Sequence, residues 1–164
     1  MNRDSNPLVF MFSLLLALSL QVLVLPDFIA SFRPLLLALT LAYWAVYAPE
    51  MPALLAAWLL GLCCDVLYGA PLGQYALGLV TVAYAARRLS GTLLAFPLWQ
   101  ATLTLVPVWA IYIFLMFWID GLTHHQADPL HRWLPLISTS LLWPLIAGML
   151  GDMRGRRSRR GILP

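Results

Sequence analysis

The residue with the clearest chemical potential is a carboxylate inside an apolar stretch. Residues 61–74 read GLCCDVLYGAPLGQ, and Asp65 is the charged residue among them. A carboxylate at the centre of a bilayer costs about 2.5–3.5 kcal/mol on insertion scales, so such a residue faces protein or water and usually meets a partner. Two interpretations stay open. Asp65 has a structural role, or it contacts a ligand or partner protein directly.

The residues around Asp65 favour a close helix contact followed by a turn. Gly61, Asp65 and Gly69 are spaced by four, so they share one helix face, where small residues let another helix approach. The turn continues the motif with Pro71, Leu72, Gly73 and Gln74.

The expected partner of Asp65 is Arg33, which begins a helix at the same side of the membrane. An arginine beside a carboxylate can bond it bidentately. We therefore predict that Asp65 is ionised, pairs mainly with Arg33 and secondarily accepts amides of the 69–73 turn. Asp27 competes for Arg33.

A second polar cluster is DGLTHHQADPLHRW (120–133), with His124, His125, Asp128 and His131. Imidazoles and a carboxylate at such spacing can bind zinc. A solvated loop is the favoured interpretation, because Pro129 breaks the helix that would align these ligands. No H-E-x-x-H, G-x-S-x-G or P-loop motif is present, so we expect no enzyme, no metal site and no cofactor.

The elements that must position Asp65 are membrane helices. The 164 residues are 62% hydrophobic and 10% charged, with a mean hydropathy of +0.82, whereas soluble domains carry about 25% charged residues. The apolar runs lack the alternation of a β-barrel, and helices satisfy their own backbone in lipid. Proline, glycine and charge predict an all-α integral membrane protein with six transmembrane helices, at about 7–25, 34–48, 53–68, 72–89, 97–119 and 133–152.

Arginine placement predicts the orientation of these helices. With the N-terminus in the cytoplasm, eight arginines lie inside, and Arg33 and Arg132 lie outside. Six spans return the C-terminus to the cytoplasm. The chain then divides into a transmembrane domain, 1–152, and an Arg-rich cytoplasmic tail, 153–164. The tail is expected to anchor on anionic lipids or, alternatively, to contact a cytoplasmic protein, with no nucleic acid bound, through Arg154, Arg156, Arg157, Arg159 and Arg160.

The stretch 61–89 resembles the central segment of the bacterial rod-shape-determining family MreD, with its G-x-x-x-D-x-x-x-G-x-PLG pattern. RPLLLALTLAYW (33–44), FPLWQ (96–100) and TSLLWP (139–144) are also similar to members of that family. The resemblance implies a non-enzymatic inner-membrane component of the cell-elongation machinery. It implies as partners an MreC-like periplasmic scaffold, an MreB-like actin homologue, a RodA-type glycosyltransferase and its penicillin-binding transpeptidase.

Within the resemblance, the motif carries over with a structural or interfacial role and without a catalytic residue: Asp65, Gly69, Pro71, Leu72, Gly73 and Gln74. An alternative function is the substrate-binding membrane subunit of a small-molecule importer, which is similar in layout. Under that interpretation Asp65 lines an outward-facing cavity. A lipid-modifying enzyme is a third class, but the sequence has no paired acid and base and no metal cluster to support it.

Overall fold

The computed structural model describes residues 7–23, 32–122 and 129–160, and within these ranges every regular element is a helix. The predicted all-α class is therefore confirmed. Seven helices are found in the described ranges: α1 (Pro7–Val22), α3 (Leu36–Tyr47), α4 (Ala53–Tyr68), α5 (Gln74–Arg88), α6 (Ser90–Ala95), α7 (Leu98–Leu122) and α8 (Pro129–Arg160).

Apart from α6, these helices overlap the six predicted ranges, although α3 has only 12 residues. The prediction of 53–68 coincides with α4, where Pro52 before the helix and Gly69 after it set the ends. The predicted loop after residue 89 contains the short helix α6. The last helix begins at Pro129, before the predicted start at 133, and continues past 152 to Arg160.

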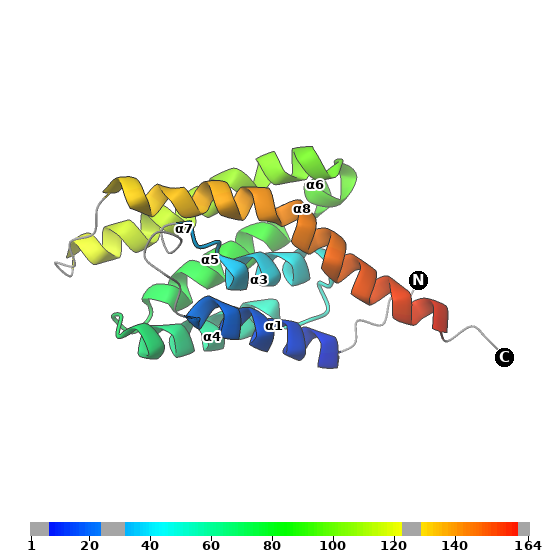
Figure 1. Ribbon diagram of the computed structural model, residues 1–164, viewed down its shortest axis with the longest axis horizontal. Coiled ribbons are helices and arrows are strands. Elements are labelled where there is room, and N and C mark those ends of the chain that lie inside the picture. The colour runs from blue at the N-terminus through cyan, green and yellow to red at the C-terminus, as the bar shows by residue number, and fades with distance from the viewer. Residues whose placement is uncertain (1–6, 24–31, 123–128, 161–164) are drawn as a thin grey trace.

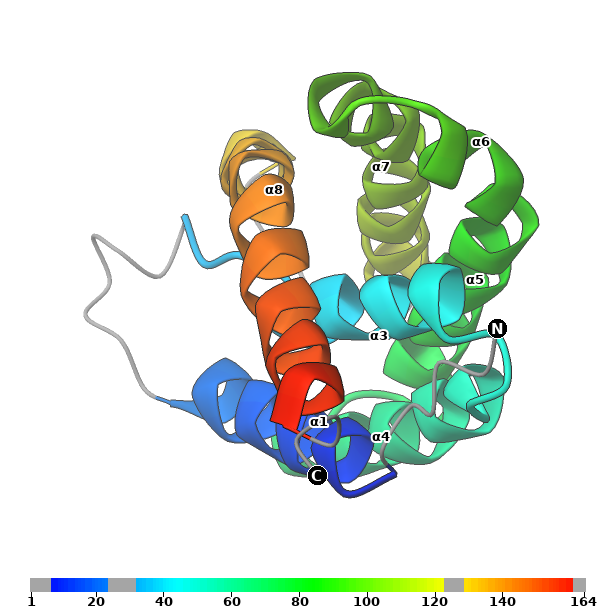
Figure 2. The ribbon, with the colours of Figure 1, turned by 90° about the vertical axis from the view of Figure 1, so that its right-hand side faces the viewer.

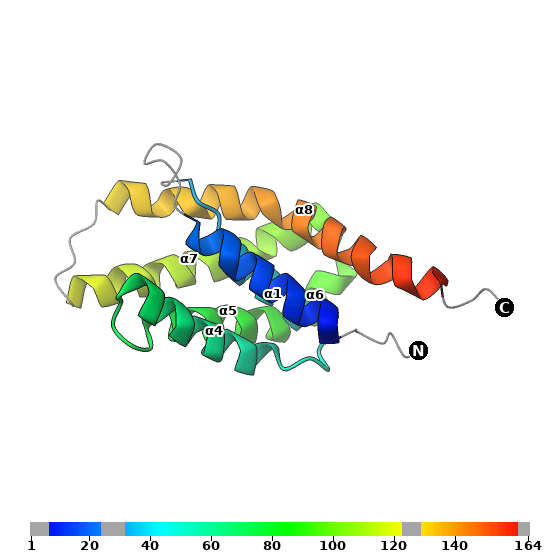
Figure 3. The same cartoon turned by 60° about the horizontal axis from the view of Figure 1, so that its bottom comes forward.

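The long helices run back and forth between two ends of one bundle (Figures 1 and 3). At the turn end, α4 is followed by α5 and α7 is followed by α8. At the terminal end, α1 begins and α8 finishes. We use these two names below.

Helix α3 lies at the centre of the bundle, with the other helices around it (Figure 2). It packs against α1, α4, α5, α6 and α8, and residues 37–46 are all buried. Twelve residues rise only about 18 Å, less than the roughly 30 Å of hydrocarbon. A short helix is tolerated here because protein, and not lipid, surrounds it.

The core is aromatic and the outside is apolar too. Trp44 of α3 packs edge-on against Phe10 of α1, and its indole N–H donates to Ser13 Oγ at 2.9 Å. Leucine, phenylalanine and tryptophan side chains also cover much of the outer surface, where water would disfavour them. Helix α7 and residues 133–150 of α8 are each long and apolar enough to cross a membrane, whereas α1, α3 and α4 are shorter apolar helices.

Candidate functional site

Asp65 lies in the last turn of α4 and is completely buried. Its Oδ2 accepts the amide N–H of Gly73 at 2.8 Å, and its Oδ1 accepts that of Tyr75 at 2.7 Å. Gly73 is the N-cap residue of α5, whose first amides have no partner within the helix. Asp65 therefore caps the neighbouring helix, where its negative charge also complements the helix dipole. We call this arrangement the Asp65 clamp.

The turn between α4 and α5 has a shape that glycine permits. Gly69 (φ 62°) ends α4 in the left-handed conformation, and Gly73 (φ 98°) is also in the positive-φ region. The amide of Ala70 donates to the backbone carbonyl of Asp65 at 2.9 Å. Asp65 thus holds the turn through its backbone and its side chain together.

Gly61 lies at a close contact between α4 and α5, as the spacing predicted. A Cβ atom at this position would lie 2.6 Å from the backbone nitrogen of Ala76, closer than real contacts allow. A Cβ at Gly69, in contrast, would have no atom within 4 Å. The prediction that Gly69 also leaves room for a neighbouring helix is therefore wrong, because this glycine is needed for its backbone conformation.

Gln74, the last residue of the motif, links α5 to α7. Its Nε2 donates to Asp120 Oδ1 at 2.7 Å, its Oε1 has no hydrogen-bond partner, and the residue is 4% exposed. Sequence reasoning did not select Asp120. The sequence feature that indicates Asp120 is its position near the C-terminus of the predicted helix 97–119, on the same side of the membrane as the motif. Leu72, in the same turn, is 77% exposed and projects outward.

Arg33 does not pair with Asp65, although both residues belong to the described part of the chain. Both Asp65 oxygens are bonded to amides, and the buried Nε and Nη2 of Arg33 have no hydrogen-bond partner. The predicted main partner is therefore wrong and the predicted secondary partner, the turn, is the one observed. The N-terminus of α5 follows Asp65 after a short turn, and its first amides have no acceptor within the helix. They therefore bind the carboxylate.

A small, mostly apolar pocket lies beside the clamp and has room for about one water molecule. Tyr68, Tyr75 and Tyr112 line it together with Gln21 of α1, and the Tyr68 hydroxyl donates to the Gln21 carbonyl at 2.8 Å. Asp65 does not line this cavity and is closed off by its two amides. The placement of Asp65 that the importer interpretation requires is therefore not found.

Other predicted residues lie partly outside the described residues. The histidine loop falls mainly in 123–128, which the structure does not describe, and the described residues contain no group that could hold a metal ion. The backbone of the arginine tail is helical through Arg160, while the side chains of 151–160 are outside the description. Cys63 is exposed and Cys64 is buried, and neither forms a disulfide.

The bundle and its clamp define an all-helical membrane protein whose motif carboxylate serves the turn between two helices. The model of the family "rod shape-determining protein MreD" matches residues 2–152, so the chain belongs to this family. The chain is also similar to the rod shape-determining protein MreD of Haemophilus influenzae, with 29% identity over 122 residues, 74% of this chain and 75% of the relative. No solved structure matches the chain. Family membership gives the protein a role in determining cell shape.

Proposed function

We propose that the chain is a multi-pass protein of the bacterial inner membrane, with six spans and both termini in the cytoplasm. Four observations support this placement. The helices other than α6 alternate in direction (Figure 1), α1 begins and α8 ends at one end of the bundle, and the arginines within the described ranges favour that end seven to two.

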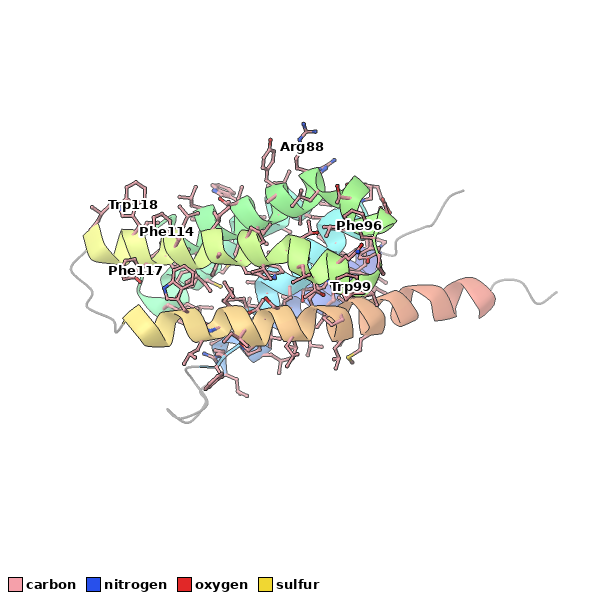
Figure 4. The ribbon with its side chains drawn as sticks, turned by 90° about the horizontal axis from the view of Figure 1, so that it is seen from above. Arg88, Phe96, Trp99, Phe114, Phe117 and Trp118 are labelled. Atoms are coloured by element: carbon pink, nitrogen blue, oxygen red, sulfur yellow. The ribbon has the colours of Figure 1, made fainter. Side chains whose placement is uncertain are left out.

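The fourth observation is an aromatic girdle at each end of α7 (Figure 4). Trp99 is 63% exposed near the terminal end and Trp118 is 58% exposed near the turn end. Nineteen residues separate them, which corresponds to about 28 Å along a helix and matches the hydrocarbon thickness. Phe96 lies with the first girdle, and Phe114 and Phe117 lie with the second.

Cysteine labelling tests this topology. Cys63 and Cys64 are first replaced by alanine, and single cysteines are introduced at Ala127 and Ser158. A membrane-impermeant reagent is expected to label position 127 from outside and position 158 only after lysis. Labelling of both positions from outside contradicts six spans.

We further propose that the protein is a non-enzymatic scaffold of the cell-elongation complex and supports lateral peptidoglycan synthesis. The observation that carries this proposal is the Asp65 clamp. The motif carboxylate is buried and bonded to two backbone amides, so its chemistry is used to fix a turn and not to act on a substrate. A scaffold needs such rigid geometry, because its function lies in the surface it presents.

The partners that we propose follow from the family: an MreC-like periplasmic scaffold, an MreB-like actin homologue, and the RodA-type glycosyltransferase with its penicillin-binding transpeptidase. The turn of the clamp is the surface that we propose for contact. Leu72 projects from it with 77% of its area exposed, beside a backbone that Asp65 holds in place.

A pull-down from membranes tests the scaffold with a matched pair of variants. Leu72→Ala and Leu141→Ala remove equally exposed leucines, one from the turn and one from the outer face of α8. Both variants are expected to accumulate normally. Leu72→Ala should lose most of the peptidoglycan synthases that the parent chain and Leu141→Ala recover.

Two outcomes contradict the scaffold proposal. Recovery of ATPase subunits in place of peptidoglycan synthases indicates the importer. Equal recovery by Leu72→Ala and Leu141→Ala removes the turn from the contact surface. Depletion of the protein in a rod-shaped host is the accompanying measurement, and rounding of the cells is expected.

A further inference from the structure

Arg33 lies just before α3, at the turn end of the bundle. One edge of its guanidinium group has no hydrogen-bond acceptor. Nε and Nη2 are both shielded from solvent and neither donates a hydrogen bond. These two nitrogens form the side-on edge of the guanidinium, which presents two parallel N–H bonds to a planar or tetrahedral anion. A buried charged donor without an acceptor is unfavourable, and an anion with two oxygens is the acceptor that fits this edge best.

The described carboxylates at this end of the bundle do not provide that anion. Asp65 binds the amides of Gly73 and Tyr75, and Asp120 accepts from the side chain of Gln74. Neither carboxylate is hydrogen-bonded to the free edge of Arg33.

The N-terminus of α3 adds to the positive charge near Arg33. Helix N-termini carry a partial positive charge, and the first turn of α3 contains no acidic residue. Arg33 adds a full positive charge three residues before the helix starts. The nearby amides of Leu35 and Leu37 already donate to Thr139 Oγ1 and Gln21 Oε1, so an incoming anion would meet the guanidinium.

The depth of this site in the membrane follows from α8. The amide of Leu35 donates to Thr139 Oγ1 at 3.0 Å, and Thr139 lies six residues beyond Trp133, which is partly exposed at the turn end. Six helical residues rise about 9 Å. The chain near Arg33 therefore lies below the level of Trp133. Because the free edge is shielded from solvent, a headgroup phosphate reaches it only when the Arg33 side chain turns toward the headgroup level, as long arginine side chains near helix ends do.

We propose that the free edge of Arg33 binds the headgroup phosphate of a membrane phospholipid at the turn end of the bundle. Every phospholipid brings a phosphate oxygen pair to this level, and a side-on arginine edge matches that pair. An ion pair with a carboxylate of a partner protein is the competing occupant, and a free edge that serves only such a partner would leave phosphatidylglycerol unbound in the experiment below. The proposal rests on the membrane placement above and is independent of the role in cell shape.

Native mass spectrometry of the full chain in neutral detergent tests the proposal, with phosphatidylglycerol as the probe. The parent chain is expected to retain one tightly bound phosphatidylglycerol. Arg33→Gln should bind it at least about tenfold more weakly, because a charge-assisted bidentate contact is lost. Arg33→Lys keeps the charge without the fork and should be intermediate. Arg132→Gln, which removes the other arginine at this end, should match the parent.

The remaining arms identify the source of the phosphate. Diacylglycerol with the same acyl chains should not bind, and millimolar inorganic phosphate should not displace the lipid. Thermal unfolding is measured with and without phosphatidylglycerol, so the lipid-dependent increment is compared even where Arg33→Gln lowers the baseline stability. If Arg33→Gln does not fold, Arg33→Lys provides the comparison.

Several results overturn the proposal. Equal retention of phosphatidylglycerol by the parent and Arg33→Gln would show that Arg33 does not bind the lipid. Displacement of the lipid by inorganic phosphate would show that the site binds free anions. If phosphatidylglycerol binds only to the Asp27→Asn variant, the free edge of Arg33 is occupied by the Asp27 carboxylate in the parent chain. If cysteine labelling supports six spans but the parent and Arg33→Gln retain the lipid equally, only the lipid-site proposal is wrong. If cysteine labelling contradicts six spans, the position of Arg33 in the membrane is no longer supported.

Discussion

Replacing Asp65 by asparagine is the sharpest test of the clamp, because the side chain keeps its shape. The carboxylate is fully buried and accepts two amide N–H groups at 2.8 and 2.7 Å. Hydrogen bonds to a charged group each contribute about 1.5–3 kcal/mol. Asparagine keeps one acceptor oxygen and turns its NH₂ group toward the second amide, so Asp65→Asn should lower the free energy of unfolding by about 2–4 kcal/mol.

The assay is equilibrium unfolding of the purified chain in mixed micelles, in which the mole fraction of sodium dodecyl sulfate is raised. The seven tryptophans provide the fluorescence signal. Asp120→Asn is the matched control at the same end of the bundle. Its amide oxygen can still accept from Gln74 Nε2, so its loss should stay below about 1 kcal/mol. Asp65→Ala, which leaves both amides without an acceptor, should lose about 2–6 kcal/mol, since each buried unsatisfied donor costs about 1–3 kcal/mol.

The refuting result combines stability with phenotype. If Asp65→Asn unfolds at the same denaturant level as the parent and assembles normally while cells lose their rod shape, the structural account is wrong. Asp65 would then belong to a direct functional contact. If Asp65→Asn and Asp120→Asn are equally destabilised, the two amide bonds of the clamp are not the source of the loss.

Three further predictions address the neighbouring features. Gly61→Ala should force α4 and α5 apart and cost about 1–3 kcal/mol of unfolding free energy, whereas Gly148→Ala, with open space around it, should be neutral or stabilising. The exchange of Arg33→Asp with Asp65→Arg should recover nothing relative to either single variant in the same unfolding assay, and recovery would restore the ion pair rejected above. Changing all five arginines of 153–164 to lysine should leave cell shape near normal by microscopy, because headgroup attraction depends on charge, and a strong defect would indicate a specific partner contact.

The helix ends were predictable where proline or glycine residues flank the helix. Residues 53–68 were placed correctly because prolines precede them and the glycine-containing turn follows. Short or continuing helices were harder. Helix α6 has only six residues between a predicted helix end and Pro97, and α8 continues because arginine is a good helix former.

The neighbours of a buried side chain were less predictable than the helices. The sequence placed Asp65 and Arg33 at one side of the membrane, and their opposite charges favoured a pair. It also contained the competing signal, since a helix N-terminus with free amides begins soon after Asp65. Two fixed backbone donors at short sequence distance satisfy a carboxylate without ordering a long side chain, which explains why the turn amides and not Arg33 bind Asp65.

The turn end of the bundle therefore contains two kinds of polar group, and they suit different tasks. Asp65 is fully bonded within the chain, so it fixes the shape of a turn that carries an exposed leucine. The side-on edge of Arg33 is not bonded within the described chain, so an external group is needed there. Loss of Asp65 should act on every partner at once through the turn. Loss of Arg33 should act on one ligand and leave the turn intact, which makes the two effects separable in the same membranes.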